Sequence, residues 1–147
     1  MSGTIKPEDC ERSNYRYFTS SATRWDDNDQ YGHMNNSRYY TYFDDTIGKF
    51  QMFECGLDLL KEPVVAYVAH SQCSYLDSVS YPEHIDIGLR VNRIGNSSVE
   101  YGLAMFRKDE DQAVATSTFT HVFVNKSTGK SAPIPDTIRS AMKALSV

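Results

Sequence analysis

The sequence predicts an α+β domain in which one long helix packs against one face of a curved antiparallel sheet. Three observations support this class: an early strand-like segment, one segment with the apolar spacing of a helix, and four later strand-like segments joined by short turns. Short connections join antiparallel neighbours, and a helix with one apolar face can bury that face against a sheet. The 147 residues suffice for one such domain but not for two of ordinary size.

The chain opens with a polar stretch, residues 1–14, which we expect to form a flexible N-terminus ahead of a single domain over residues 15–147. The segment Tyr15–Arg24 is rich in Tyr, Phe and Thr and therefore predicts the first strand. Asp, Asn, Gly and Gln dominate residues 25–35, and this composition indicates a loop.

A helix is predicted directly after this loop. Four apolar residues recur at i, i+3, i+7 and i+10, which places them on one helix face: Tyr40, Phe43, Ile47 and Phe50. Asn35 or Asn36 can cap the helix start, because an Asn side chain accepts a hydrogen bond from the first free N–H groups. Gly56 can end the helix, because glycine readily adopts the left-handed conformation that follows a last turn.

Strand patterns resume after Pro63, and turn-forming residues separate them. The four predicted strands are Val64–Tyr75, His84–Val91, Val99–Met105 and Ala113–Asn125. The second of these alternates cleanly between apolar and polar residues, so we expect Arg90 on a polar, solvated face. A short last helix is expected over Thr137–Leu145, with Asp136 as its cap.

Composition narrows the possible function classes. The net charge is -4 and no basic cluster occurs, which argues against a nucleic-acid-binding protein. The three cysteines are widely spaced, which is typical of a reduced, cytoplasmic protein, and Cys73 is expected to be a buried thiol. We expect no signal peptide and no membrane span, because no apolar run has the required length. No His or Cys spacing indicates zinc, and no cofactor is expected.

The loop before the helix admits three interpretations. A calcium-binding loop that starts at Asp27 would need a Glu at its twelfth position, where this chain has Arg38. Asp, Asn and Gly also gather before helices simply because they form turns and caps. The third interpretation is a catalytic site, because a carboxylate beside a helix start combines a base or nucleophile with N–H donors for a carbonyl oxygen.

Residues 27–39 read D-x-D-x-x-G-H-M-N-N-x-x-Y, with Trp25 shortly before them. This pattern resembles the signature of the hot-dog-fold thioesterases, such as 4-hydroxybenzoyl-CoA thioesterase and its acyl-CoA thioesterase relatives, and the likeness continues through the later strands. The resemblance implies a hot-dog fold, in which a curved antiparallel sheet wraps around one long central helix, and hydrolysis of acyl-CoA thioesters to free acid and CoA. The G-x-S-x-G elbow of serine hydrolases is missing, as are the motifs of hot-dog hydratases.

In this family the second Asp of the D-x-D pair is catalytic, so the resemblance assigns that role to Asp29, as general base or as nucleophile. The backbone N–H of Asn35 or Asn36 would polarise the thioester carbonyl, and the Asn36 side chain would hold water or the carboxylate. His33 would either orient the loop or assist catalysis. Two further acids of the segment, Asp26 and Asp27, are expected to be loop and surface residues.

Substrate contacts are expected from six residues: Tyr31, Gly32, Tyr39, Tyr40, Arg93 and Ser98. Tyr31 stands where the acyl-carrier variant of the family has an Asn, which argues against a carrier-protein substrate. Tyr39 and Tyr40 would line the acyl pocket, whereas Phe43 is expected in the core. Relatives hold the nucleotide phosphates near the turn that is Gly95–Ser98 here, but this turn carries no charge, so the mode of CoA binding stays open.

The family forms dimers whose sheets pair edge to edge, and often tetramers, with the active site at the dimer interface. The resemblance therefore implies a homodimer or homotetramer that acts on acyl-CoA, with no nucleic-acid or membrane partner. The alternative from another class is a non-catalytic acyl-CoA-binding or scaffolding protein that kept the fold. The intact Asp29 favours the enzyme, and thiol release from a panel of acyl-CoAs separates the two interpretations.

Overall fold

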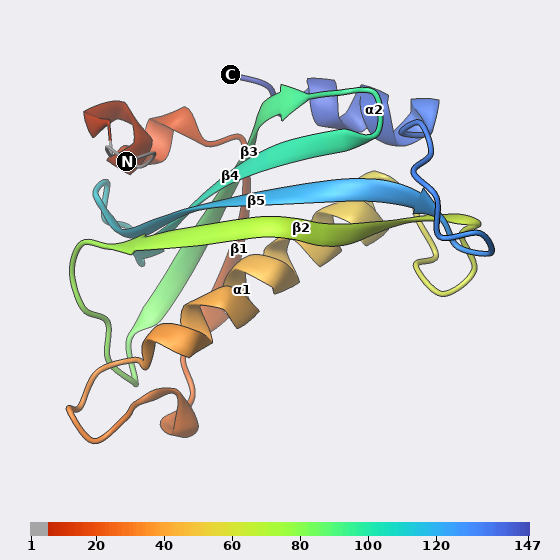
Figure 1. The fold of residues 1–147 in the computed structure, drawn as a ribbon. Helices are drawn as coiled ribbons and strands as arrows, with labels where there is room; N and C mark the ends of the chain where they lie inside the picture. Colours follow the sequence, from red (N-terminus) through yellow and green to blue (C-terminus); the bar gives the residue numbers. More distant parts are fainter. Residues whose placement is uncertain (1–5) are drawn as a thin grey trace.

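The computed structural model describes residues 6–147, in which five strands form one antiparallel sheet in the order β1-β3-β4-β5-β2. The strands are β1 Tyr17–Ala22, β2 Val64–Tyr75, β3 His84–Ile94, β4 Ser98–Arg107 and β5 Ala113–Asn125. Helix α1, Asn36–Lys49, runs obliquely across one face of the curved sheet (Figure 1). This is the hot-dog arrangement that the sequence resemblance implied.

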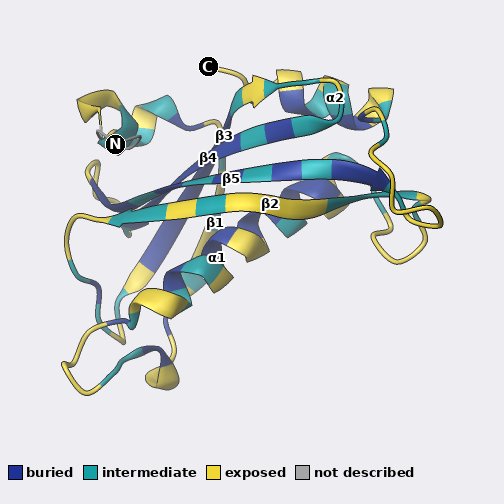
Figure 2. Cartoon of the chain, in the orientation of Figure 1, coloured by how far each residue is buried: buried dark blue, intermediate teal, exposed yellow. Residues whose placement is uncertain are grey.

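The main core lies between α1 and the facing side of the sheet. Phe43, Ile47 and Phe50, from the predicted helix face, are each no more than 1% exposed, and the inward residues of β3 and β4 are equally buried (Figure 2). Helix α2, Asp136–Lys143, closes one end of this core with Ile138 and Met142. Burial of this apolar surface is what holds the helix on the sheet.

Both ends of α1 follow local rules. Asn35 is the N-cap, and its side chain accepts a hydrogen bond from the Ser37 N–H. The helix continues beyond Lys49 into a π-helical turn, Phe50–Glu54, and Gly56 then adopts the expected left-handed conformation with φ +70°. None of the helices formed within residues 6–147 is long and apolar enough to cross a membrane.

The outer face of the sheet is partly covered by the segment that we expected to be flexible. Residues 1–5 lie outside the described residues, but Pro7–Cys10 and Arg12–Asn14 form 3-10 turns that fold onto the sheet. Arg12 forms an ion pair with Asp86 of β3, with 3.0 Å between Nη1 and Oδ2. The expectation of a loose segment therefore does not hold for residues 7–14, because they cover a face of β3.

This cover also corrects the prediction for Arg90. We expected a solvated surface residue, but Arg90 is only 9% exposed. Its guanidinium pairs with Asp9 and lies over the ring of Tyr15, 4.8 Å from the ring centroid. The prediction for Asp136 is also wrong, because Pro135 is the N-cap of α2 and Asp136 is the first helical residue.

Candidate active site

The predicted site loop connects β1 to α1 and folds back on itself. The Asp29 N–H donates to the His33 carbonyl, and the Gly32 N–H donates to the Asp29 carbonyl, each over 3.0 Å. Gly32 lies at φ +80°, a conformation that side chains with a Cβ disfavour. The glycine thus permits the tight turn that presents Asp29 at the start of α1.

Two donors hold the Asp29 carboxylate. The backbone N–H of Tyr31 donates to Oδ1 over 2.9 Å, and the side-chain Nδ2 of Asn35 donates to Oδ2 over 3.1 Å. The Oδ1 of the same Asn35 amide accepts from the N–H of Ser37 over 3.0 Å. One side chain therefore both caps the helix and orients the carboxylate, which leaves further lone pairs on Asp29 for a ligand.

The helix start offers one free backbone donor beside this carboxylate. The Asn35 N–H donates to the Asp27 carbonyl over 2.8 Å, and the next two donors of the turn, Ser37 and Arg38, bond to the Asn35 side chain and carbonyl. Within residues 6–147 the Asn36 N–H has no acceptor. Of the two amides expected to face a substrate carbonyl, Asn36 is therefore the one available.

Asp27 is not the surface residue that we expected. It is 3% exposed, and its carboxylate accepts hydrogen bonds from the Tyr42 hydroxyl and, over 2.9 Å, from the Arg24 N–H. Asp26 is exposed, as expected. Asp27 is buried because a polar partner on the second turn of α1 compensates its carboxylate, as buried charges require.

A surface hollow of about 420 Å³ lies in front of the helix start. It is lined by Asp29, Tyr31, His33, Met34, Asn36, Tyr39, Tyr75, Asp77 and Ser78, and we call it the Asp29 hollow. Five of the residues predicted from the sequence therefore meet in one place, and Asn35 lies directly behind them. The backbone carbonyl of Gly32 accepts a hydrogen bond from Ser80 over 2.6 Å, so the turn is anchored to the loop before β3.

The two predicted aromatic residues differ in position. Tyr39 is buried at the rim of the Asp29 hollow, where its ring meets Tyr75 edge to face at 5.0 Å between centroids. The Tyr75 hydroxyl in turn donates to the Asn36 carbonyl over 3.1 Å. Tyr40 instead packs against Phe119 of β5, with centroids 5.7 Å apart, and does not line the hollow.

No sequence pattern indicated the ion pairs of Arg107, which support the part of the Asp29 hollow formed by Asp77 and Ser78. Arg107, near the end of β4, pairs with Asp77 at 3.1 Å and with Glu83 at 2.9 Å, and it also donates to the Ser78 carbonyl. Hydrogen bonds from the Ser78 N–H and from Arg107 lower the pKa of Asp77. These residues come from separate segments without a shared motif, so no local signal could have found them.

Arg93 and Ser98 are not brought to Asp29 within one chain. They lie at the turn between β3 and β4, whereas the Asp29 loop contacts the residues just before His84, at the other end of β3. Nine residues of extended strand separate the two ends, which is about 30 Å. Arg93 and Ser98 therefore do not line the Asp29 hollow of their own chain.

The arrangement offers an oriented carboxylate and a free N–H at one hollow, which suits attack on a carbonyl carbon. Cys73 is half-buried, and burial raises the pKa of its thiol to about 11, so it carries little thiolate at neutral pH. Residues 6–147 contain no group of three or more His, Cys, Asp or Glu side chains placed to bind a metal ion.

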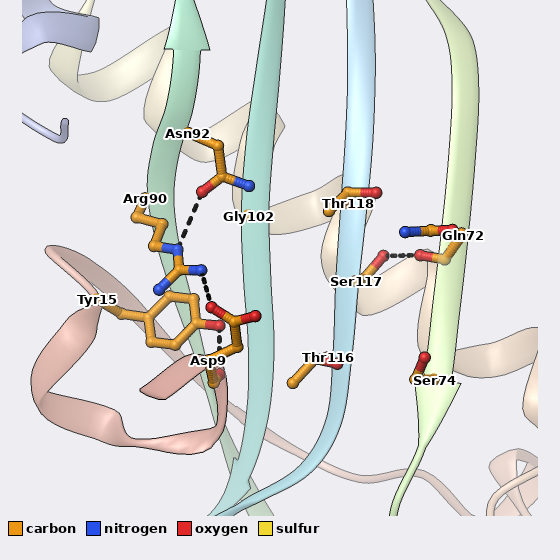
Figure 3. Close-up of a pocket in the computed structure, with 10 residues that line it drawn as sticks. All are labelled: Asp9, Tyr15, Gln72, Ser74, Arg90, Asn92, Gly102, Thr116, Ser117 and Thr118. Atoms are coloured by element: carbon orange, nitrogen blue, oxygen red, sulfur yellow. Dashed lines mark hydrogen bonds and ion pairs between the residues drawn. The ribbon is translucent and has the colours of Figure 1, made fainter. Parts of the chain in front are cut away.

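A different hollow, of about 90 Å³, lies on the opposite face of the sheet (Figure 3). Gly102 makes room for it, because a Cβ there would lie 2.8 Å from the side-chain oxygen of Asn92. Its polar groups largely bond to one another: Arg90 donates to Asn92 over 3.0 Å and pairs with Asp9. These internal bonds identify it as a structural feature of the outer face, separate from the Asp29 hollow.

Comparison with known proteins places the chain among relatives of the same fold. The family model of the thioesterase-like superfamily matches residues 23–142. The structure of the PA5185 protein from Pseudomonas aeruginosa is 41% identical and superimposes with a TM-score of 0.91 over 93% of this chain and 96% of that one. The PA2801 protein from the same species is 27% identical, with a TM-score of 0.79 over 84% and 95%. The protein YsmA of Bacillus subtilis is 27% identical over 81% of this chain and 80% of its own.

Proposed function

The chain belongs to the thioesterase-like superfamily, and we propose that it hydrolyses acyl-CoA thioesters to the free acid and CoA, with Asp29 as the catalytic carboxylate. The observation that carries the proposal is the pairing of this carboxylate with the free N–H of Asn36 at one hollow. Thioester hydrolysis needs these two elements together, because one activates the attacking oxygen and the other stabilises the oxygen that becomes negative.

In the proposed reaction the thioester carbonyl oxygen accepts a hydrogen bond from the Asn36 N–H. Asp29 takes a proton from a water molecule, the water oxygen bonds to the carbonyl carbon, and the carbon–sulfur bond then breaks. The CoA sulfur leaves as a thiolate and takes up a proton. One oxyanion donor of this kind typically contributes about 3 kcal/mol to the transition state.

The same geometry also permits direct attack by Asp29 on the carbonyl carbon, which would form a mixed anhydride that water then hydrolyses. Oxygen-18 labelling can establish the second route, because label from solvent enters the Asp29 side chain only when water opens an anhydride at the Asp29 carboxyl carbon. His33 and the Asn36 side chain line the hollow, and we assign them to holding the thioester or the attacking water.

We also propose that the active protein is at least a dimer paired through β2. This strand is at the edge of the sheet, spans Val64–Tyr75 and leaves Tyr67, Val68 and Tyr75 exposed. An unpaired edge of that length favours pairing with another strand. Antiparallel pairing of two such edges would bring the Arg93–Ser98 end of one copy toward the Asp29 end of the other, which is the arrangement that CoA contacts from these residues need.

The test is thiol release from a panel of acyl-CoAs. Asp29→Asn is expected to lower kcat by about a hundredfold to ten-thousandfold, which is the usual contribution of a positioned acid–base group. The melting temperature is expected to stay unchanged. Asp26→Asn is the matched control, because Asp26 is an exposed acid three residues away, and it is expected to keep full activity. Full activity of Asp29→Asn overturns the assignment. Binding of acyl-CoA by the wild type without turnover would establish the non-catalytic alternative instead.

A further inference from the structure

Residues 76–83 join β2 to β3, and we call them the β2–β3 connector. This connector lies beside the loop of Asp29 at the start of α1 (Figure 1). Three hydrogen bonds join the two segments: the Met34 N–H to the Val79 carbonyl at 2.7 Å, the Ser80 hydroxyl to the Gly32 carbonyl at 2.6 Å, and the Tyr81 N–H to Oδ1 of Asn28 at 3.0 Å. The site loop is therefore tied to the connector on both sides of Asp29 in the chain.

The bond to Gly32 reaches the turn that presents Asp29. The Gly32 N–H donates to the Asp29 carbonyl over 3.0 Å, so Asp29 engages the N–H of this glycine and Ser80 engages its carbonyl. The same turn brings the Tyr31 N–H to Oδ1 of Asp29 over 2.9 Å. Hydrogen bonds tolerate only small changes of distance and angle. A displacement of Ser80 would therefore move the Asp29 main chain and weaken a donor to its carboxylate.

Arg107 of β4 holds the connector in turn. Each nitrogen of its guanidinium group binds a different residue: Nε binds Oε2 of Glu83 at 2.9 Å, Nη1 binds Oδ2 of Asp77 at 3.1 Å, and Nη2 donates to the Ser78 carbonyl. Glu83 continues the contact, because its Oε1 accepts a hydrogen bond from the Ser80 N–H over 2.8 Å. A continuous series of contacts thus runs from Arg107 through Glu83 and Ser80 to the turn of the site loop.

We propose that Arg107 is a positioning residue for Asp29: it fixes the β2–β3 connector, and the connector fixes the turn that presents the carboxylate. The inference rests on the proposed function and deepens it, because it adds a residue of β4 to the support of the reaction. Arg107 does not line the Asp29 hollow, so it acts through the connector and not by contact with a substrate. A displacement of about 1 Å in a reacting group can lower a rate about a hundredfold, so support at a distance from the carboxylate matters for turnover.

The geometry of the contacts favours an effect of position over an effect of charge. The positive charge of Arg107 is compensated by Asp77 and Glu83, whose carboxylate oxygens lie 3.1 and 2.9 Å from its nitrogens. A guanidinium group presents its N–H donors in one rigid plane, whereas a lysine carries a single nitrogen on a flexible chain. Only arginine can therefore hold the three acceptors of the connector at once, and a lysine at this position would restore the charge alone.

The first experiment measures kcat and KM for variants of the full chain with the acyl-CoA that the wild type hydrolyses fastest. Arg107→Gln is expected to lower kcat about tenfold and to change KM less than about twofold, because a displaced Asp29 affects the transition state more than binding. Arg107→Lys is expected to lose as much kcat as Arg107→Gln. Arg90→Gln is the matched control, since it removes an arginine ion pair on the opposite face of the sheet, and it is expected to keep kcat. Wild-type kcat in Arg107→Gln, or full rescue by lysine, overturns the proposal.

An NMR measurement tests the position of Asp29 without turnover. The Tyr31 N–H donates to the Asp29 carboxylate, so the Tyr31 amide signal of a proton–nitrogen correlation spectrum reports that contact. The signal is expected to shift in Arg107→Gln and to stay in place in Arg90→Gln. An unmoved Tyr31 signal in Arg107→Gln overturns the proposal. If the wild type hydrolyses no acyl-CoA, the proposed function fails, and a shifted signal still establishes the contact between Arg107 and the site loop.

Ser80→Ala tests the route of the effect and removes only one hydroxyl, so it also carries both measurements if Arg107→Gln does not fold. It is expected to lower kcat several-fold and to shift the Tyr31 signal, because the Gly32 carbonyl loses the hydrogen bond from Ser80. The double variant of Arg107→Gln and Ser80→Ala is expected to turn over about as fast as the slower single variant, since both changes interrupt one series of contacts. Losses that multiply in the double variant, or wild-type kcat in Ser80→Ala, overturn the route through the connector.

Discussion

The hydroxyl of Tyr42 donates a hydrogen bond to the buried carboxylate of Asp27, and this contact fixes the loop that carries Asp29 to helix α1. The Asp27 main chain is engaged as well, since its carbonyl accepts from the Asn35 N–H over 2.8 Å. Asp27 thereby determines where the loop ends and where the helix begins. The geometry of the candidate site depends on this buried pair, although neither residue lines the Asp29 hollow.

Replacing Tyr42 with Phe should therefore weaken both the fold and the site. Loss of the hydrogen bond leaves a buried carboxylate with one donor fewer, and we expect the free energy of unfolding to fall by about 2 kcal/mol. Urea unfolding followed by circular dichroism measures this change. Tyr81→Phe is the control, because Tyr81 is exposed, and we expect a change within about 0.5 kcal/mol. Equal stability of the two variants would show that the Tyr42 bond contributes nothing.

Asn35 allows the helix cap to be separated from the support of Asp29. In Asn35→Asp the new carboxylate can still accept from the Ser37 N–H, so we expect the helix to keep its stability. The same group can no longer donate to Asp29 and repels it, so thioester turnover should fall at least about tenfold. Asn35→Ala, which removes both contacts, should also lose about 1 kcal/mol of stability. Wild-type turnover in Asn35→Asp would mean that this amide does not position Asp29.

Arg107 helps to lower the pKa of Asp77, the other acidic residue that lines the Asp29 hollow. The pKa of Asp77 is lowered first by the Ser78 N–H and then by Arg107, so Asp77 stays ionised to a lower pH than an ordinary Asp. In Arg107→Gln the contribution of Arg107 is lost while the Ser78 bond can remain, and the pKa of Asp77 should rise toward its ordinary value. An NMR titration of the Asp77 carboxyl carbon measures the shift. Arg93→Gln, at the far end of β3, should leave the titration unchanged, and an unchanged titration in Arg107→Gln would contradict the assignment.

Local sequence patterns predicted the elements well where one rule dominates. The bounds of β2 and β5, Val64–Tyr75 and Ala113–Asn125, were predicted to the residue, because turn-forming residues flank both strands. Gly56 was correctly predicted to follow the helix, because its left-handed conformation has a simple sequence signal. The position of β2 beside β5 could not be predicted. In the chain, 37 residues separate the end of β2 from the start of β5, and no local pattern specifies that the two strands pair.

The predictions that failed concern contacts between distant segments. Alternation along β3 correctly gave the face of Arg90 but not its environment, because Asp9 and Tyr15 of another segment cover that face. Asp27 looked like a loop residue because its partner Tyr42 lies fifteen residues later, on a helix. Asp29, His33 and Asn36 line one hollow because they are close in the chain, and the catalytic roles assigned to them stay predictions.

The buried His121 should make the stability of the protein depend on pH. Burial lowers the pKa of its ring from 6.5 to about 4, so between these values the unfolded chain binds a proton that the folded chain does not. As the pH falls from 6.5 toward 4 the free energy of unfolding should therefore decrease, by up to about 3 kcal/mol from this residue, and above pH 6.5 the residue imposes no such loss.

Replacing His121 with Phe removes the titrating group at similar volume, so the loss of stability between neutral pH and about pH 4 should become smaller by up to about 3 kcal/mol. Urea unfolding at a series of pH values measures both curves. His84→Gln is the control, since His84 is exposed at the start of β3 and its removal should leave the wild-type curve unchanged. Parallel curves for the wild type and His121→Phe would show that the ring reaches a proton acceptor or water in the folded state.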